Sequence, residues 1–248
     1  MSRSRFGEIP KPTVQSGWKK ICIYLQIYAL ALQGCFVFER VIIMADRSRD
    51  NKLRKMTVTA IMAAMGFVLM MIGDYIPVPL MPSFIKIDLS ELPALITSFA
   101  FGPLWGIAVC LIKNLVHMIL FFSNSYGIGD LINFLMGIPF VAVAGIVYKY
   151  KHDRKSAFIG ALAGDFAMAA ACFLINLFIA YPLYMKVMGL TPDMILGMYQ
   201  AVVPSVDTFA KGILLFNVPF TFIKGLISVV ITFVIYHKLS PILKGKKI

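Results

Sequence analysis

Long apolar stretches alternate with short polar segments along most of the chain, and most of these stretches are long enough to cross a lipid bilayer. Spanning about 30 Å of hydrocarbon takes roughly 20 mostly apolar residues as a helix, because every backbone polar group must be bonded within the segment. The pattern predicts six helices. They cover residues 54–73, 90–101, 103–123, 129–150, 156–184 and 212–237.

The second predicted helix is short and is separated from the third by Phe101-Gly102-Pro103. Proline cannot continue a helix, and it disfavours the α conformation in the residue before it. With 59% apolar and 15% charged residues, the composition also excludes an ordinary water-soluble domain. We therefore expect an all-α membrane protein built as a bundle of six transmembrane helices.

The segment before Met44 is open to several interpretations. Its apolar run, residues 21–38, has about the minimum length for a span, so it is an extra helix, a signal-anchor or an uncleaved leader. Met44-Ala-Asp-Arg also resembles an ordinary initiation site, and residues 1–43 can equally derive from an upstream start codon. We treat residues 1–43 as an uncertain extension and residues 44–248 as one domain.

Basic residues predict the orientation of the bundle. The net charge of +12 is concentrated in clusters at 47–55, 149–155 and 238–247, between or after apolar runs. This distribution is typical of cytoplasmic loops and does not form the basic stripe of a nucleic-acid-binding protein. We expect a cytoplasmic C-terminus and external connections at 74–89, 123–128 and 186–211. The first connection is proline-rich and apolar, which makes it a candidate lid.

Polar side chains inside the predicted spans gather toward the external half. Such residues are costly in a membrane and usually face a bundle interior or a cavity, although a lone Asn or Thr often serves as interhelical glue. Because the inner half holds chiefly Asp165, with Lys113 near the midplane, we expect a blind pocket open to the outside rather than a channel. The outer group comprises Asn114, His117, Asn133, Asn176, Asn217, Thr221 and Lys224.

Three of the ionisable residues have alternative interpretations. Lys224 lacks a carboxylate at helical spacing on its own helix, so it needs a partner from elsewhere or a ligand. Lys113 shares a helix face with His117, and one of them can be a structural donor to the second helix. Asp165 can pair with Lys113 as internal packing.

The first helix carries a ridge of small residues, Ala60, Ala63 and Ala64, that would let another helix approach closely. This ridge serves either packing within the bundle or a partner interface. The four cysteines stand singly, without metal-ligand spacing, and the chain has no phosphate-loop motif and no zinc-protease or hydrolase motif. We expect no enzymatic activity, no bound metal and no cofactor.

Several ordered motifs between about residues 54 and 240 resemble the riboflavin-binding S components of energy-coupling factor (ECF) transporters. The most specific stretch runs from Pro82-Ser-Phe-Ile-Lys-Ile-Asp-Leu-Ser-Glu-Leu-Pro through Phe101-Gly-Pro-Leu-Trp-Gly to Lys113-Asn-Leu-Val-His117. Further matches are Gly129-Asp-Leu-Ile-Asn, Asn176 with Tyr181-Pro-Leu-Tyr-Met-Lys186, and Pro219-Phe-Thr-Phe-Ile-Lys-Gly225.

This resemblance implies a six-helix bundle in the plasma membrane of a prokaryotic cell. It would capture riboflavin outside, under the loop that joins the first two helices, and dock on a transmembrane coupling subunit with two cytoplasmic ATPases. The whole bundle would then topple in the membrane to carry the pocket inward. Ala60 and Ala64, with Ala63 beside them, would contact the coupling subunit.

The resemblance also implies roles for the pocket residues, since a flavin needs a flat apolar slot and a few donors and acceptors at its pyrimidine edge. Lys224 would donate to a flavin carbonyl, and Asn176 would pair with the ring N–H and the adjacent carbonyl. Phe84 of the 74–89 loop would line the slot. The ribityl hydroxyls would meet Asn114, Asn133 and Lys113, unless these residues brace the loop.

Two positions depart from the family pattern. Thr221 stands where the sixth helix usually has Asn, so Asn217 would have to remake the lost contact, and Asp130 replaces a Glu. An S component for a different flavin or vitamin is therefore an alternative. A membrane-embedded enzyme or a regulatory protein is a further one, although facing helices show no nucleophile–base pair.

Overall fold

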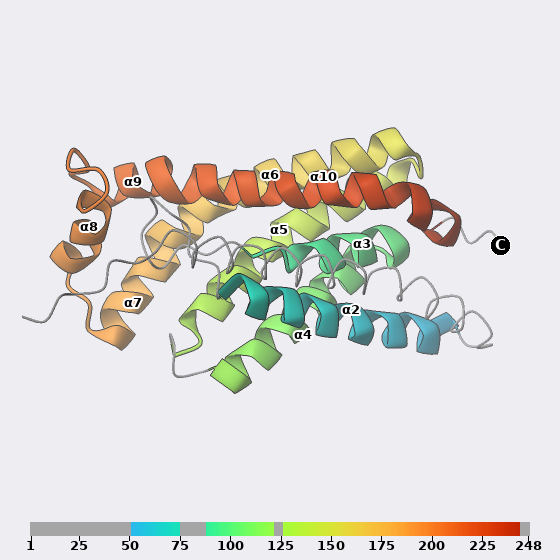
Figure 1. The fold of residues 1–248 in the computed structure, drawn as a ribbon, viewed down its shortest axis with the longest axis horizontal. Helices are drawn as coiled ribbons and strands as arrows, with labels where there is room; N and C mark the ends of the chain where they lie inside the picture. The colour runs from blue at the N-terminus through green and yellow to red at the C-terminus, as the bar shows by residue number, and fades with distance from the viewer. Residues whose placement is uncertain (1–50, 75–87, 122–125, 244–248) are drawn as a thin grey trace, which may run out of the picture.

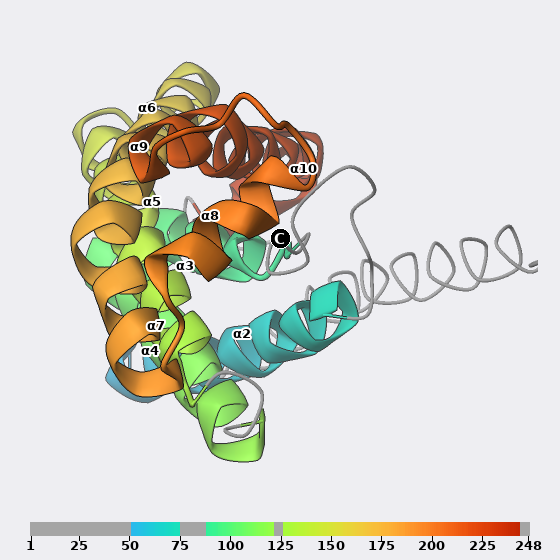
Figure 2. The same ribbon diagram turned by 90° about the vertical axis from the view of Figure 1, so that its left-hand side faces the viewer.

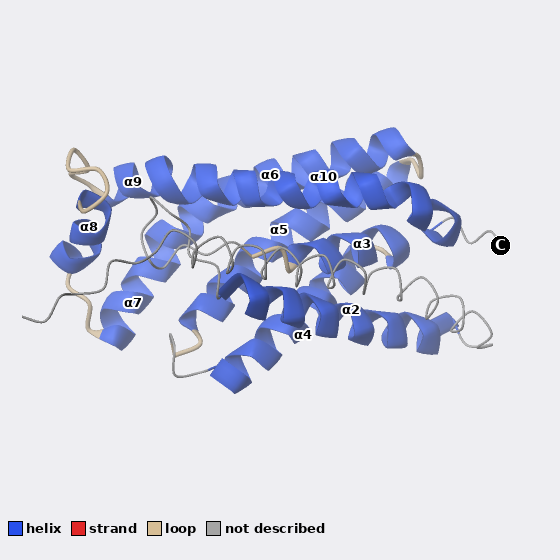
Figure 3. Ribbon diagram, viewed as in Figure 1, coloured by secondary structure: helices blue, strands red, loops and turns tan. Residues whose placement is uncertain are grey.

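The computed structural model describes residues 51–74, 88–121 and 126–243, and these residues form helices and turns without a strand (Figure 3). The long helices are α2 (Asn51–Asp74), α4 (Pro103–Phe121), α5 (Ile128–Tyr150), α6 (Arg154–Ile175) and α10 (Val218–Leu243). The shorter ones are α3 (Glu91–Phe101), α7 (Tyr181–Met188), α8 (Pro192–Gln200) and α9 (Phe209–Gly212). Two π-helical turns join them, η2 (Asn176–Ala180) and η3 (Ile213–Asn217).

Five helical segments in the described part are long and apolar enough to cross a membrane. They are Lys52–Asp74, Pro103–Phe121, Ile128–Tyr150, Arg154–Met188 and Phe209–Val234. The prediction of apolar helices at these places is confirmed. The second predicted helix is α3, whose 11 residues rise only about 16 Å, roughly half the hydrocarbon thickness.

Helix α3 ends where the sequence predicts a break. Gly102 adopts a φ of 98°, a left-handed conformation that glycine tolerates at little cost, and its N–H donates to the carbonyl of Ser98 at 2.9 Å. Pro103 then begins α4, where its missing N–H has no partner to lose. The chain therefore reverses direction within one residue.

Helix α3 lies in the middle of the molecule, between a layer of α6 with α10 and a layer of α2 with α4, and beside α5 (Figure 1). Nine of its residues, from Glu91 to Phe99, are buried. Close packing against α5 depends on small residues, because a Cβ added to Gly145 would lie 2.2 Å from the hydroxyl of Ser98. That hydroxyl donates to the carbonyl of Val141 at 2.7 Å. A central helix this deeply enclosed can hold polar side chains away from lipid.

Helix α4 shows how the sequence orients its polar residues. Its buried positions recur every three or four residues, as expected for one face of an α-helix. These positions are Gly106, Val109, Cys110, Lys113, Asn114 and His117. The opposite face exposes large apolar side chains, for instance Leu104 and Ile119, which are 78% and 73% exposed. The outer face is therefore suited to lipid and the inner face to a polar interior.

The fifth and sixth predicted helices extend beyond their expected ends. Helix α6 begins with Asp153 as N-cap, which accepts a hydrogen bond from the Ser156 N–H at 2.7 Å, and it continues through η2 and α7 to Met188. The region 186–211, which we predicted as an external connection, contains α8. Thr191 caps that helix at its N-terminus.

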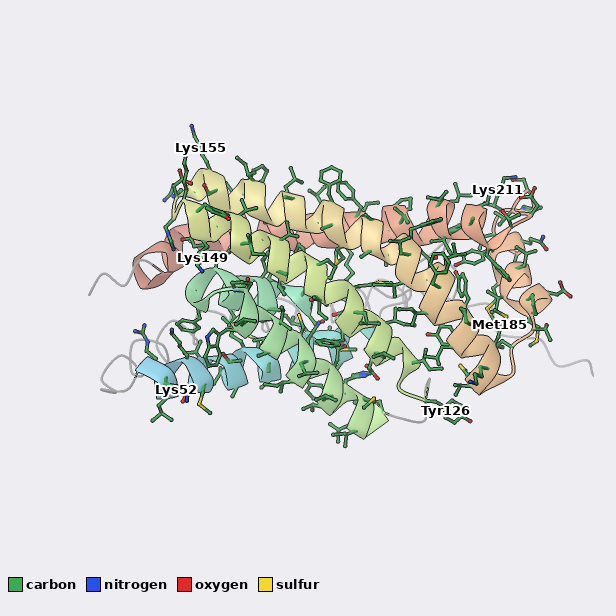
Figure 4. All side chains as sticks on the ribbon, turned by 180° about the vertical axis from the view of Figure 1, so that it is seen from behind. Lys52, Tyr126, Lys149, Lys155, Met185 and Lys211 are labelled. Atoms are coloured by element: carbon green, nitrogen blue, oxygen red, sulfur yellow. The ribbon has the colours of Figure 1, made fainter. Side chains whose placement is uncertain are left out.

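The two ends of the molecule differ in chemistry. Lys52, Lys149 and Lys155 lie at one end, and Tyr126, Met185 and Lys211 lie at the other (Figure 4). Helix α8 lies at this second end, between α7 and α9 along the chain (Figure 2). The apolar run 21–38, most of the predicted lid and residues 123–125 fall outside the described residues.

Candidate ligand pocket

A pocket of about 540 Å³ lies among α2, α4, α5, α6, α7, α8 and α10, and its volume falls in the range of about 300–1,000 Å³ that is usual for small-molecule sites. Much of its lining is apolar, including Met70, Phe121, Ile132, Met136 and Phe220. The predicted outer group of polar residues meets here. His117, Asn133, Asn176, Asn217, Thr221 and Lys224 all line the pocket.

Lys224 reaches its partners on other elements. Its Nζ lies 3.5 Å from Oδ2 of Asp88, just before α3, and 3.4 Å from Oδ1 of Asn133 on α5. The amide nitrogen of Asn133 donates to the same Asp88 oxygen at 3.1 Å and to Oδ1 of Asn114 at 3.2 Å. Asn114 therefore supports the pocket from behind, without lining it. The two contacts of Lys224 are long, so a ligand carbonyl can compete for its ammonium group.

A second ion pair lies next to the Lys224 contacts and is more deeply buried. Nζ of Lys113 on α4 lies 2.8 Å from Oε1 of Glu91 in the first turn of α3, and both side chains are almost completely buried. The same Nζ donates to the hydroxyl of Ser90, which in turn donates to Asp88 at 2.9 Å. The prediction of a structural donor from this face to the second helix is confirmed for Lys113. Lys113 does not line the pocket.

His117 holds together the ends of two other helices. Its Nε2 lies 2.9 Å from Oδ2 of Asp74, the last residue of α2, and its Nδ1 lies 2.7 Å from Oδ1 of Asp130 in the first turn of α5. Both contacts are hydrogen bonds when each ring nitrogen carries a proton. Asp74, His117 and Asp130 all line the pocket, so this cluster forms one polar wall.

A third polar region lies where α6 and α10 face the pocket. Asn176 donates through its amide nitrogen to the carbonyl of Cys172 at 2.8 Å and to the Cys172 sulfur at 3.3 Å. The Thr221 hydroxyl lies 3.3 Å from the same sulfur. With its NH₂ engaged by its own helix, Asn176 presents its carbonyl oxygen to the pocket.

Helix α8 is joined to this region by tyrosines. The hydroxyl of Tyr199 on α8 donates to Oδ1 of Asn217 at 2.9 Å and is also hydrogen-bonded to the hydroxyl of Tyr181 on α7. Tyr199 is completely buried and Tyr181 nearly so. Because its carbonyl is occupied by Tyr199, Asn217 offers its NH₂ group to a ligand.

Some predicted and actual partners differ. The alternative that Asp165 pairs with Lys113 is wrong: Asp165 is fully buried on α6, and within the described residues neither of its oxygens has a hydrogen-bond partner. Phe84 falls outside the described residues. Sequence reasoning missed Asp88 and the Asp74–His117–Asp130 cluster. The absence of a partner for Lys224 on its own helix was the one signal that could have pointed to Asp88.

Comparison with known proteins decides the family. The profile of the family described as "ECF transporter, substrate-specific component" matches residues 54–236. The chain belongs to this family of S components. A solved S component of a bacterial ECF transporter superposes with a TM-score of 0.60 at 29% identity, covering 78% of this chain and 99% of that one.

Two curated relatives of this S component are named riboflavin transporters. RibU of Staphylococcus aureus is 29% identical over 191 residues, which cover 77% of this chain and 93% of the relative. FmnP of Bacillus subtilis is 31% identical over 191 residues, with 77% and 94% covered. Together with the apolar helices, this membership makes the chain a multi-pass membrane protein of a transport system. It is a binding component, not an enzyme, and its ligand is cargo and not a cofactor.

The small-residue ridge of this S component divides between two environments. Ala60 and Ala64 are exposed on the outer face of α2, whereas Ala63 is only 1% exposed and packs in the core. Of the two alternatives for the ridge, Ala63 therefore follows internal packing and not the partner interface that the family resemblance implied for it.

The buried ion pair yields a stability prediction for the S component. Glu91→Gln removes the carboxylate that is paired directly with the Lys113 ammonium, and removal of one partner of such a pair typically costs about 3–5 kcal/mol. Thermal unfolding in detergent should show a large loss for this variant. The matched double variant Glu91→Leu with Lys113→Met removes both charges and should recover most of the loss. Wild-type stability of Glu91→Gln would contradict this account.

Proposed function

We propose that this S component captures riboflavin at the external face of the cell membrane for ATP-driven uptake by partner subunits. The observation that carries the proposal is the pocket, in which an ammonium, an amide carbonyl and an amide NH₂ converge beside apolar side chains. These groups come from Lys224, Asn176 and Asn217. The names of the curated relatives point to the same ligand.

The polar groups match the pyrimidine edge of an isoalloxazine ring, which presents carbonyl oxygens on either side of an N–H. In our proposal the carbonyl of Asn176 accepts from the ring N–H, and Lys224 and Asn217 donate to the carbonyls. The NH₂ of Asn217, whose orientation follows from its bond to Tyr199, would take the place of the Asn that Thr221 replaces. Asn133 and the Asp74–His117–Asp130 wall remain for the ribityl hydroxyls.

We also propose how the bundle sits in the membrane. The basic end, with Lys52, Lys149 and Lys155, lies in the cytoplasm under the positive-inside rule, and the C-terminus lies there too. The pocket end with α8 then faces outward. Helix α3 would count as the sixth helix of the bundle. Its short length is compatible with its burial, because a helix that is surrounded by other helices does not need to cross the lipid by itself. Residues 44–248 form this single domain.

The proposed partners are a transmembrane coupling subunit and two cytoplasmic ATPases. Ala60 and Ala64 lie four residues apart on the exposed face of α2, an arrangement that allows a second helix to approach closely. Ala60 lies nearer the basic end of α2 and Ala64 lies close to its middle, and neither of them lines the pocket. This surface is therefore separate from the ligand site.

A titration of the purified full chain with riboflavin tests the proposed ligand through quenching of flavin fluorescence. We expect saturable quenching at micromolar concentrations or below, and Lys224→Met should weaken binding about tenfold to a hundredfold because a charge-assisted hydrogen bond is lost. Lys211→Met is the matched control, since Lys211 is exposed and pairs with Asp207 at 2.7 Å. No quenching by the wild type, or equal losses in both variants, would refute the assignment.

Bulky residues on the small-residue surface test the proposed partner contact. Ala60→Leu with Ala64→Leu should abolish riboflavin uptake by cells and leave riboflavin binding by the purified chain unchanged, because the pocket is not altered. Gly197→Ala on α8, where an added Cβ meets nothing within 4 Å, serves as a neutral control. A loss of binding in the double variant would instead assign Ala60 and Ala64 to internal packing.

A further inference from the structure

Two of the helices that form the pocket each contain one turn that is wider than an α-turn. In η2 the N–H of Tyr181 donates to the carbonyl of Asn176, and in η3 the N–H of Val218 donates to the carbonyl of Ile213. Each hydrogen bond spans five residues instead of the four of an α-helix, so each turn holds one extra residue. Isolated π-turns of this kind are uncommon and occur frequently at functional sites.

The first wide turn decides which residues of α7 reach the pocket. Residues five apart in a regular α-helix lie about 140° apart around the axis, yet Asn176 and Tyr181 both line the pocket. In a regular α-helix of the same sequence, the face of Asn176 would continue through Ala180, Leu183 and Val187, and none of these residues lines the pocket. The residues of this strip that line the pocket are Cys172, Asn176, Tyr181, Tyr184 and Met188.

The second wide turn does the same for the start of α10. Gly212 and Asn217, again five residues apart, both meet Tyr199: a Cβ on Gly212 would lie 2.9 Å from its ring, and Asn217 accepts its hydroxyl hydrogen bond at 2.9 Å. Thr221 and Lys224 follow Asn217 at helical spacing and line the pocket with it. The turn thus connects the face of Gly212, which packs on α8, to the face of Asn217 and Thr221, which lines the pocket.

A proline stands at the same place after each turn. Pro182 follows Tyr181, and Pro219 follows Val218. A proline inside a helix has no N–H to donate, and its ring clashes with the carbonyl four residues earlier. A wider turn relieves both conflicts, because the carbonyls before the proline are carried away from the ring. The sequence therefore encodes both turns at equivalent positions.

We propose that Pro182 and Pro219 are positioning residues for ligand recognition: the extra residue that each favours sets the helix rotation that brings Tyr181 and Asn217 into the pocket. This inference rests on the proposed riboflavin function. Neither proline needs to touch the ligand. The two turns lie on neighbouring parts of the pocket wall, and Tyr199 joins them because it is hydrogen-bonded to both Tyr181 and Asn217.

Deletion of Phe178 tests the first turn directly. Its side chain is 68% exposed and points away from the pocket, and its removal places Tyr181 four residues after Asn176, so that an ordinary α-turn keeps both on one face. Riboflavin affinity should therefore stay close to the wild-type value, because the face that meets the ligand is preserved. Phe178→Ala keeps the residue count and should bind as the wild type does. Fluorescence titration and thermal unfolding are measured for both.

The proline variants should cause the loss that the deletion does not, because they keep every residue and let each helix close as α-turns, which rotates the following residues by about 100°. Pro182→Ala and Pro219→Ala restore an N–H and should each weaken riboflavin binding about tenfold while melting cooperatively. Pro139→Ala is the control, because Pro139 lies inside α5, which has no wide turn and continues as an α-helix. A tenfold or larger loss of affinity in the folded deletion variant, or wild-type affinity in both proline variants, would overturn the proposal. No riboflavin binding by the wild type would refute the proposed function itself.

Discussion

The buried ion pair between Lys113 and Glu91 allows charged side chains to lie in the interior of a bundle whose outer face is apolar, because each charge is neutralised by the other. It joins α4 to the first turn of α3 at 2.8 Å, with both side chains almost completely buried. Through Ser90 it continues to Asp88, and Asp88 meets Lys224 at the floor of the pocket. A short central helix that could not span a bilayer by itself is thereby fixed among five longer ones. The ligand site and the core share one hydrogen-bonded network.

The rest of the pocket follows from how the long helices present their side chains. In a bilayer every span is apolar, so recognition depends on a few polar residues that must all turn inward. On α4 ordinary helical spacing achieves this. On the strip from α6 to α7 and on α10, ordinary helical spacing would not turn all the polar residues inward. There the wide turns η2 and η3 change the rotation of the helix, so that Tyr181 and Asn217 also face inward. Helix α8 then packs over this end through Tyr199.

Sequence reasoning predicted much of this arrangement and failed for identifiable reasons. Apolar runs and the Gly102-Pro103 break depend on local chemistry, so the helices were correctly placed. Partner choice depends on which helices are neighbours, and the contact of Lys113 with Glu91 instead of Asp165 could not be seen from spacing alone. Helix α8 was missed because its nine residues are too short and mixed to read as a span. The π-turns each add one residue, which no helical periodicity reveals.

The central claim is that the cluster of Lys224, Asn176 and Asn217 recognises the flavin ring. An experimental structure of the chain with riboflavin bound tests it most directly. We expect the pyrimidine edge of the ring to lie within hydrogen-bond distance of all three side chains, with the carbonyl of Asn176 facing the ring N–H. Riboflavin bound elsewhere, or in this pocket with its pyrimidine edge turned away from these residues, would contradict it.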